Sequence, residues 1–152
     1  MYHWSQFPAY EQLKKAADSE FSQLPLTNAH LHTPFSFSAF SSVEQAVQLA
    51  KDQGIKVIGI NDFNTVGGYA EWSDECYRQR IAPLFNIEMI GLNASDQQKR
   101  IRVNDPSNPG RTYLSGKGLR TSDFPAHVIA FLENAVEKNN DQSAEMTRLL
   151  NK

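Results

Sequence analysis

The feature that most constrains this chain is the alternation of short, strand-like apolar segments with segments of helical periodicity. The strand-like segments are 26–33, 55–60 and 81–90. Helices are expected between them, from about residue 41 to Gly54 and from Gly67 to about residue 80. Strands that alternate with helices in this way predict an α/β fold built from parallel βαβ units.

The segments around this repeat are less regular. A helix is expected over 9–23, a polar region follows residue 93, and 111–115 is predicted as a further short strand. We therefore divide the chain into an N-terminal helical arm (1–24) and an α/β domain (25–152).

The last predicted element is a helix that begins near Ser122. Asn139 and Asn140 are expected to interrupt it, with Asp141 as the cap of a final helix. That helix still shows an apolar face where the sequence stops. The chain is thus expected to form either a small open sheet or the N-terminal part of something larger, and we favour the second.

Composition excludes several classes of protein. The 152 residues are 40% hydrophobic and carry a formal net charge of −2, which argues against disorder and against a basic field for nucleic acid or membranes. No apolar run reaches the roughly 18 residues of a membrane span, and the start does not resemble a signal peptide. The lone Cys76, expected to pack inside a helix, fits a reducing compartment. We expect a cytoplasmic protein.

Polar residues follow the predicted strands where each of them ends. His30 and His32 are two residues apart, so their imidazoles project to the same side, and Asp62 and Glu88 lie at the ends of the next two strands. The carboxyl ends of parallel strands meet at one edge of a sheet. Imidazole and carboxylate are ligands of transition metals, so the pattern predicts a metal site; the alternative is that the histidines only pack at a strand end.

The segments 28–36, 58–65 and 86–88 resemble, in this order, three motifs of the PHP (polymerase and histidinol phosphatase) family. The resemblance implies a distorted seven-stranded β/α barrel, of which this chain would be the N-terminal part, and phosphoester hydrolysis. It implies that His30, His32 and Glu88 bind divalent Zn, Mn or Fe, as one or two ions. It also implies that Asp62 is a supporting catalytic residue.

Two positions depart from the family pattern. Phe37 stands where the first motif usually has Asp or His, and Phe63 stands where the second has His. The resemblance implies that the outer of the family's cation positions is lost and replaced by an apolar wall. His127 matches no family ligand. The remaining three ligands suit one cation with an open position for water.

The segment 99–120 contains six basic residues and only one acidic residue, Asp105. We expect Arg111 and Lys117 to bind the phosphate of the substrate, a small phosphorylated molecule or nucleotide. The alternative is a solvated loop with scattered charges.

Three hypotheses about function remain open. The first is a metal-dependent phosphoesterase of the PHP type, the second is a PHP module without catalysis that serves as a structural or interaction domain, and the third is an amidohydrolase-type metal hydrolase. Open sheet edges also allow a homo-oligomer.

Overall fold

The computed structural model describes residues 11–12, 14–15, 25–119 and 124–151. Among these residues, four strands form one sheet and lie side by side in chain order. They are β1 (Thr27–Leu31), β2 (Val57–Phe63), β3 (Ala82–Leu92) and β4 (Arg111–Gly116). The first three strands run parallel, as predicted, whereas β4 runs antiparallel to β3.

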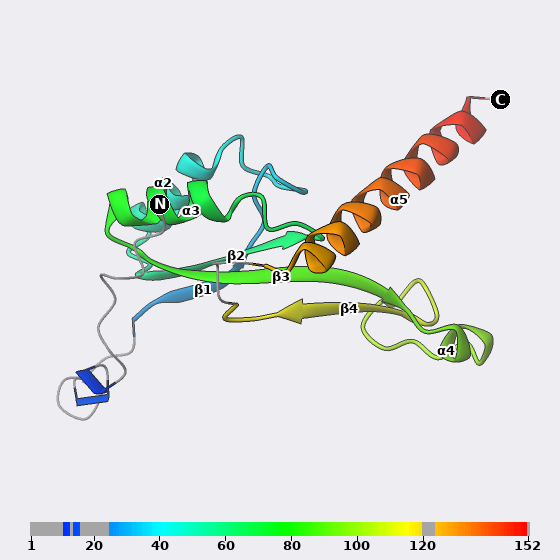
Figure 1. Ribbon diagram of the computed structural model, residues 1–152, viewed down its shortest axis with the longest axis horizontal. Coiled ribbons are helices and arrows are strands. Elements are labelled where there is room, and N and C mark those ends of the chain that lie inside the picture. Colours follow the sequence, from blue (N-terminus) through cyan, green and yellow to red (C-terminus); the bar gives the residue numbers. More distant parts are fainter. Residues whose placement is uncertain (1–10, 13, 16–24, 120–123, 152) are drawn as a thin grey trace.

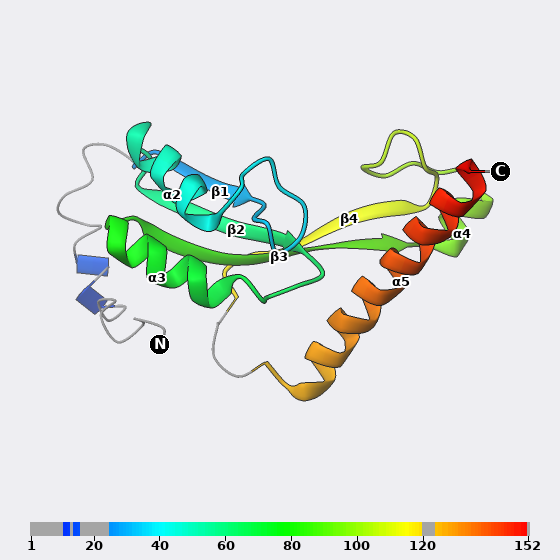
Figure 2. The same ribbon diagram turned by 90° about the horizontal axis from the view of Figure 1, so that it is seen from above.

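Two helices connect the parallel strands. Helix α2 (Val43–Asp52) joins β1 to β2, and α3 (Tyr69–Gln79) joins β2 to β3. Figures 1 and 2 show both helices on the same face of the sheet. Consecutive βαβ units with their helices on one side are the arrangement of a β/α barrel. The α/β class is therefore confirmed, and the architecture is consistent with part of such a barrel.

The direction of β4 follows from the path of the connection that precedes it. Between β3 and β4 the chain forms only turns and the five-residue helix α4 (Ala94–Gln98). It returns at the end of the sheet where β3 stops, with Asn93 N donating to Gly110 O at 2.8 Å. Strands joined at the same end of a sheet are antiparallel, because a parallel neighbour requires a crossover.

The two faces of the sheet differ in chemistry. Ile58, Ile60 and Phe85 point toward the helices and are buried against Trp72 and Cys76, among others. Burial raises the pKa of the Cys76 thiol, which keeps it protonated and unreactive, as expected of a packed cysteine. Because side chains alternate along a strand, the residues between these apolar ones lie on the opposite face.

The sequence before helix α2 offers two candidate N-cap residues, Ser41 and Ser42, and the helix begins at Val43, one residue later than a cap at Ser41 would place it. Ser42, not Ser41, is the N-cap, and its side chain accepts a hydrogen bond from Gln45 N. Gln45 Oε1 in turn accepts from Ser41 N at 2.7 Å. The pair Ser42 and Gln45 has the same three-residue spacing as the pair Ser41 and Glu44. Spacing alone therefore does not show which of these two overlapping capping boxes the helix uses.

Helix α5 corrects a second prediction. It runs unbroken from Ala126 to Leu150 and extends away from the sheet (Figure 1), so Asn139 and Asn140 do not interrupt it and Asp141 caps no new helix. Asn disfavours a helix interior by less than about 1 kcal/mol, which a helix of this length tolerates. Ser143 and Thr147 donate to carbonyls one turn earlier and so stay within the helix.

The N-terminal arm lies almost entirely outside the described residues. Of the helix predicted over 9–23, residues 11, 12, 14 and 15 are described and are helical. In the described part of the chain, no helix combines the length and the apolar character that crossing a membrane requires.

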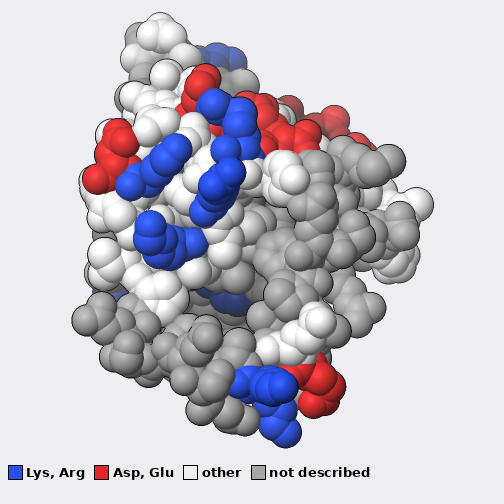
Figure 3. Space-filling model, turned by 90° about the vertical axis from the view of Figure 1, so that its left-hand side faces the viewer, with Lys and Arg blue, Asp and Glu red and all other residues white. Residues whose placement is uncertain are grey.

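Figure 3 shows the end of the molecule at which the parallel strands begin. Lys and Arg side chains gather in the upper part of this face, and Asp and Glu side chains flank them. The described residues therefore give this end a mixture of charges, not a field of one sign.

Gly59 in β2 leaves room for a hydrogen bond between β1 and β3, from the side chain of Asn86 to the backbone of Ala29. A Cβ atom at this position would lie 2.4 Å from Asn86 Nδ2 and 2.8 Å from Ala29 O, two atoms that are hydrogen-bonded to each other at 3.0 Å. Gly59→Ala is expected to destabilise the fold by about 1–3 kcal/mol, the usual cost of overpacking. Thermal unfolding measures this loss, with Gly91→Ala as the control because its Cβ would meet nothing closer than 3.7 Å. Equal effects of the two substitutions would contradict the prediction.

Candidate metal centre

The side chains predicted to bind metal come from the carboxyl end of β1 and from the point of β3 at which its pairing with β2 ends. His30 lies in β1, His32 directly after it, and Glu88 lies in β3. Phe63 pairs with Glu88 in the register of β2 and β3, and Ser115 pairs with Glu88 in that of β3 and β4. These residues therefore share the face of the sheet opposite the helices, and this face carries the polar site.

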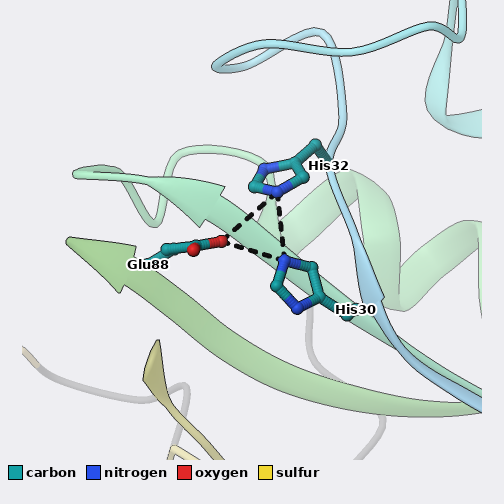
Figure 4. A group of neighbouring side chains, drawn as sticks. All are labelled: His30, His32 and Glu88. Carbon is teal, nitrogen blue, oxygen red and sulfur yellow. Dashed lines mark hydrogen bonds and ion pairs between the residues drawn. The ribbon is translucent and has the colours of Figure 1, made fainter. Parts of the chain in front are cut away.

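The structure brings the two imidazoles and the carboxylate together (Figure 4). Nε2 of His30 lies 2.9 Å from Glu88 Oε2, and Nε2 of His32 lies 3.3 Å from the same oxygen. The two Nε2 atoms are 3.2 Å apart. Ligand atoms at about 2.0–2.1 Å from a tetrahedral ion lie about 3.3 Å from one another. The three atoms thus fit three corners of a tetrahedral site and form a group that could hold a metal ion.

The chemistry of these atoms also fits a cation. Asn61 Nδ2 lies 3.0 Å from His30 Nε2, and in the Nδ1–H tautomer of His30 the amide donates to the lone pair of this imidazole nitrogen. Burial lowers the pKa of His32, which favours its neutral form, the form that binds metals. Lone pairs that face a carboxylate oxygen at such distances repel each other unless a proton or a cation lies between them.

Phe63 packs against this group. Its ring stacks on His32 with centroids 4.7 Å apart and planes inclined by 17°. His32 Nδ1 is buried and has no hydrogen-bond partner among the described residues, so the stack, not a hydrogen bond at Nδ1, orients the ring. Phe63 therefore forms the expected apolar wall. Phe37 is 77% exposed and leaves most of its ring uncovered.

Asp62, predicted as a supporting catalytic residue, lies behind the donor atoms and not among them. Its carboxylate is fully buried and accepts from Thr33 N at 2.6 Å, Thr33 Oγ1 at 2.5 Å and Ser36 Oγ at 2.7 Å. It lies one residue from Asn61, hence on the opposite side of β2. Asp62 holds the loop that follows His32 and has no surface on which to touch a substrate. We assign it a positioning role.

The two cations predicted to bind phosphate lie in different places. Lys117 is at the centre: its Nζ donates to Asn61 Oδ1 at 2.7 Å and to Ala29 O at 3.1 Å. Desolvation by burial lowers its pKa. Arg111 pairs with Leu92, which is four residues beyond Glu88 along β3. At 3.3 Å per residue, the backbone of Arg111 therefore lies about 13 Å along the sheet from that of Glu88. Its Nε lies 3.5 Å from Asp105 and its guanidinium over the ring of Tyr113.

Sequence reasoning missed Asn61 and Ser115. Asn61 is fully buried on the site face of β2, and it hydrogen-bonds Glu88 and His30 on one side and Ser115 and Lys117 on the other. The signal that could have identified Asn61 is its amide side chain, which follows the isoleucines at the end of a strand predicted to be buried on both faces. Nothing in the sequence marks Ser115.

Comparisons with known structures agree with this fold. An amidohydrolase from Chromobacterium violaceum, whose structure has bound sulfate and no metal, superposes with a TM-score of 0.62 and 17% identity over 79% of this chain and 36% of that one. A putative metal-dependent phosphoesterase from Bifidobacterium adolescentis superposes with a TM-score of 0.55 and 16% identity over 74% of this chain and 33% of that one. At these identities the likeness concerns the fold, and the chain spans about a third of either protein.

The sequence comparisons give two results. No curated protein matches this chain closely enough to count as a relative. The sequence model of the PHP domain matches residues 28–145, a stretch that contains all the side chains shown in Figure 4. Since that match covers far more than half of the 152 residues, the chain belongs to the PHP domain family.

Proposed function

We propose that this chain forms part of a metal-dependent phosphoesterase in which His30, His32 and Glu88 bind one divalent cation, Zn, Mn or Fe. The observation that carries the proposal is the meeting of their three donor atoms at 2.9 to 3.3 Å. Membership of the PHP family supports it, as does the name of the Bifidobacterium structure.

The residues around the donor atoms have distinct tasks in this proposal. A divalent cation supplies Lewis acidity: it polarises a phosphoryl oxygen and lowers the pKa of water. Phe63 holds the ring of His32 and keeps water from its face. Asp62 fixes the loop behind His32. Lys117 offers an ammonium group to an anionic oxygen of the substrate, a small phosphorylated molecule or nucleotide.

Two other functions are compatible with the same fold. The name of the Chromobacterium structure supports an amidohydrolase, but the ammonium of Lys117 beside the donor atoms favours an anionic phosphoester over a neutral amide. Phe63 in the place of a family histidine supports a module without catalysis.

Metal content and hydrolysis separate these functions. The double substitution His30→Ala and His32→Ala is expected to remove stoichiometric metal and, with it, hydrolysis of a model phosphodiester. His127→Ala is the matched control, because His127 is an exposed histidine of α5. A wild-type chain that folds but binds no Zn, Mn or Fe would favour the module without catalysis, and hydrolysis of amides alone would favour the amidohydrolase.

The placement of the two cations yields a separate prediction about phosphate. Lys117→Met is expected to weaken binding of inorganic phosphate to the metal-loaded protein by about 10- to 100-fold, since hydrogen bonds to charged groups contribute about 1.5–3 kcal/mol. Arg111→Ala is expected to have a smaller effect, because Arg111 lies toward the far end of β4. Calorimetric titration of phosphate measures both. An unchanged phosphate affinity in Lys117→Met would show that Lys117 does not bind phosphate. An unchanged affinity in Arg111→Ala would show the same for Arg111.

A further inference from the structure

Asn61 is the most highly connected polar side chain beside the donor atoms. Its Oδ1 accepts from Lys117 Nζ and from Ser115 Oγ, each at 2.7 Å. Its Nδ2 donates to Glu88 Oε2 at 2.8 Å and to His30 Nε2 at 3.0 Å. Both ends of the amide are thus in use, although the side chain is fully buried.

The orientation of this amide is fixed by chemistry. An ammonium group only donates hydrogen bonds, so the atom of Asn61 that faces Lys117 must be the carbonyl oxygen. The NH₂ group then faces Glu88 and His30. A flipped amide would direct its oxygen at the carboxylate of Glu88 and its hydrogens at an ammonium, and would lose the hydrogen bonds to both groups.

The two hydrogen bonds from the NH₂ group reach the atoms that would ligate the ion. The bond to Glu88 holds Oε2, and not the other oxygen, beside the imidazoles. The bond to His30 uses the lone pair of Nε2, which can serve either the amide or a cation. A carboxylate oxygen keeps a second lone pair, so Asn61 would hold Glu88 Oε2 in the arrangement that a cation needs, whereas its hydrogen bond to His30 would be exchanged for the cation.

We propose that Asn61 is a positioning residue of the metal centre and that Lys117 and Ser115 act on the centre through it. The proposal rests on the metal-binding function proposed above. Outer partners of metal ligands commonly raise metal affinity by about 10- to 100-fold because they fix the orientation of the ligands.

Asn86 provides a matched control. It is the register partner of Asn61 on β3, it lies on the same face of the sheet, and it is equally buried. Its amide joins Ala29 O to Gly118 N and, among the contacts of the described residues, does not reach His30, His32 or Glu88. A general loss of stability from removing a buried amide should thus appear in both Asn61→Leu and Asn86→Leu.

The test measures Zn²⁺ affinity by chelator competition and the absorption spectrum of the Co²⁺-loaded protein, which reports the geometry around the ion. Asn61→Leu is expected to weaken Zn²⁺ binding by about 10- to 100-fold and to alter the Co²⁺ spectrum. Asn86→Leu is expected to leave both unchanged, even where its unfolding temperature falls. Equal affinities and spectra in the two variants would overturn the proposal.

Lys117→Met gives a second measurement that does not depend on how Asn61→Leu folds. It is expected to weaken Zn²⁺ binding, and adding it to Asn61→Leu should cause no further loss, because residues that act through one another are not additive. Unchanged affinity in Lys117→Met, or full additivity with Asn61→Leu, would also overturn the proposal. If the wild-type chain binds neither Zn²⁺ nor Co²⁺, the proposed metal function fails and this inference fails with it.

Discussion

Glu88→Gln is expected to abolish tight binding of divalent metal while leaving the fold intact. Gln has nearly the same shape as Glu, but it removes the single negative charge that faces His30 and His32 at 2.9 and 3.3 Å. Loss of an outer partner alone weakens metal binding by about 10- to 100-fold, so loss of a ligand and its charge should exceed the upper value.

Thermal unfolding with and without Zn²⁺ measures this effect. A ligand present at 100 times its Kd stabilises the native state by about 2.7 kcal/mol, so the wild-type chain should unfold at a higher temperature when Zn²⁺ is added. Glu88→Gln should show no such shift. Glu75→Gln is the control, since Glu75 is a carboxylate of α3 that pairs with Arg78 on the other face of the molecule. A zinc-dependent shift of wild-type size in Glu88→Gln would exclude Glu88 as a ligand.

Asp62→Ala is expected to lower the free energy of unfolding by about 3–5 kcal/mol, the range of the largest single-residue effects. The substitution leaves N and Oγ1 of the fully buried Thr33 without their acceptor, and each buried donor without a partner costs about 1–3 kcal/mol. It also opens a cavity beneath the loop that carries His32.

Urea unfolding measures this loss. Asp62→Asn keeps the volume and one acceptor oxygen, so its effect should lie between those of the wild type and Asp62→Ala. Asp52→Ala, an exposed aspartate of α2, should change the free energy of unfolding by no more than about 0.5 kcal/mol. A loss below about 1 kcal/mol in Asp62→Ala would show that the hydrogen bonds to Thr33 have little net value.

The parallel part of the fold could be predicted because local and long-range requirements agree there. Each of the first two apolar strands is followed by an amphipathic helix, and this alternation favours parallel strands joined by right-handed crossovers. Helix α5 could not be predicted at its full length, since most of its surface is exposed and the tertiary contacts that mark helix boundaries are few. In the sequence, the Asn139–Asn140 pair therefore indicates a helix boundary that the structure does not have.

The candidate site could be predicted in part for a related reason. His30, His32 and Glu88 lie in or directly after strands whose direction is fixed by the βαβ rule. Arg111 begins and Lys117 follows a strand, β4, whose direction depends on a connection without periodicity. Because β4 is antiparallel, Lys117 lies beside the donor atoms and Arg111 lies at the opposite end of the strand. The sequence does not determine the direction of β4, so it could not distinguish the two cations.

The assignment of neighbouring residues of β2 to opposite faces limits how this segment can change. Ile60 and Asp62 serve the interior and the loop beneath it, whereas Asn61 and Phe63 serve the donor atoms. An insertion or deletion of one residue within β2 would exchange these two sets, placing an amide among isoleucines and an isoleucine beside the imidazoles. A point substitution in this strand therefore affects one face of the sheet at a time, whereas a change in its length would disable folding and chemistry in a single step.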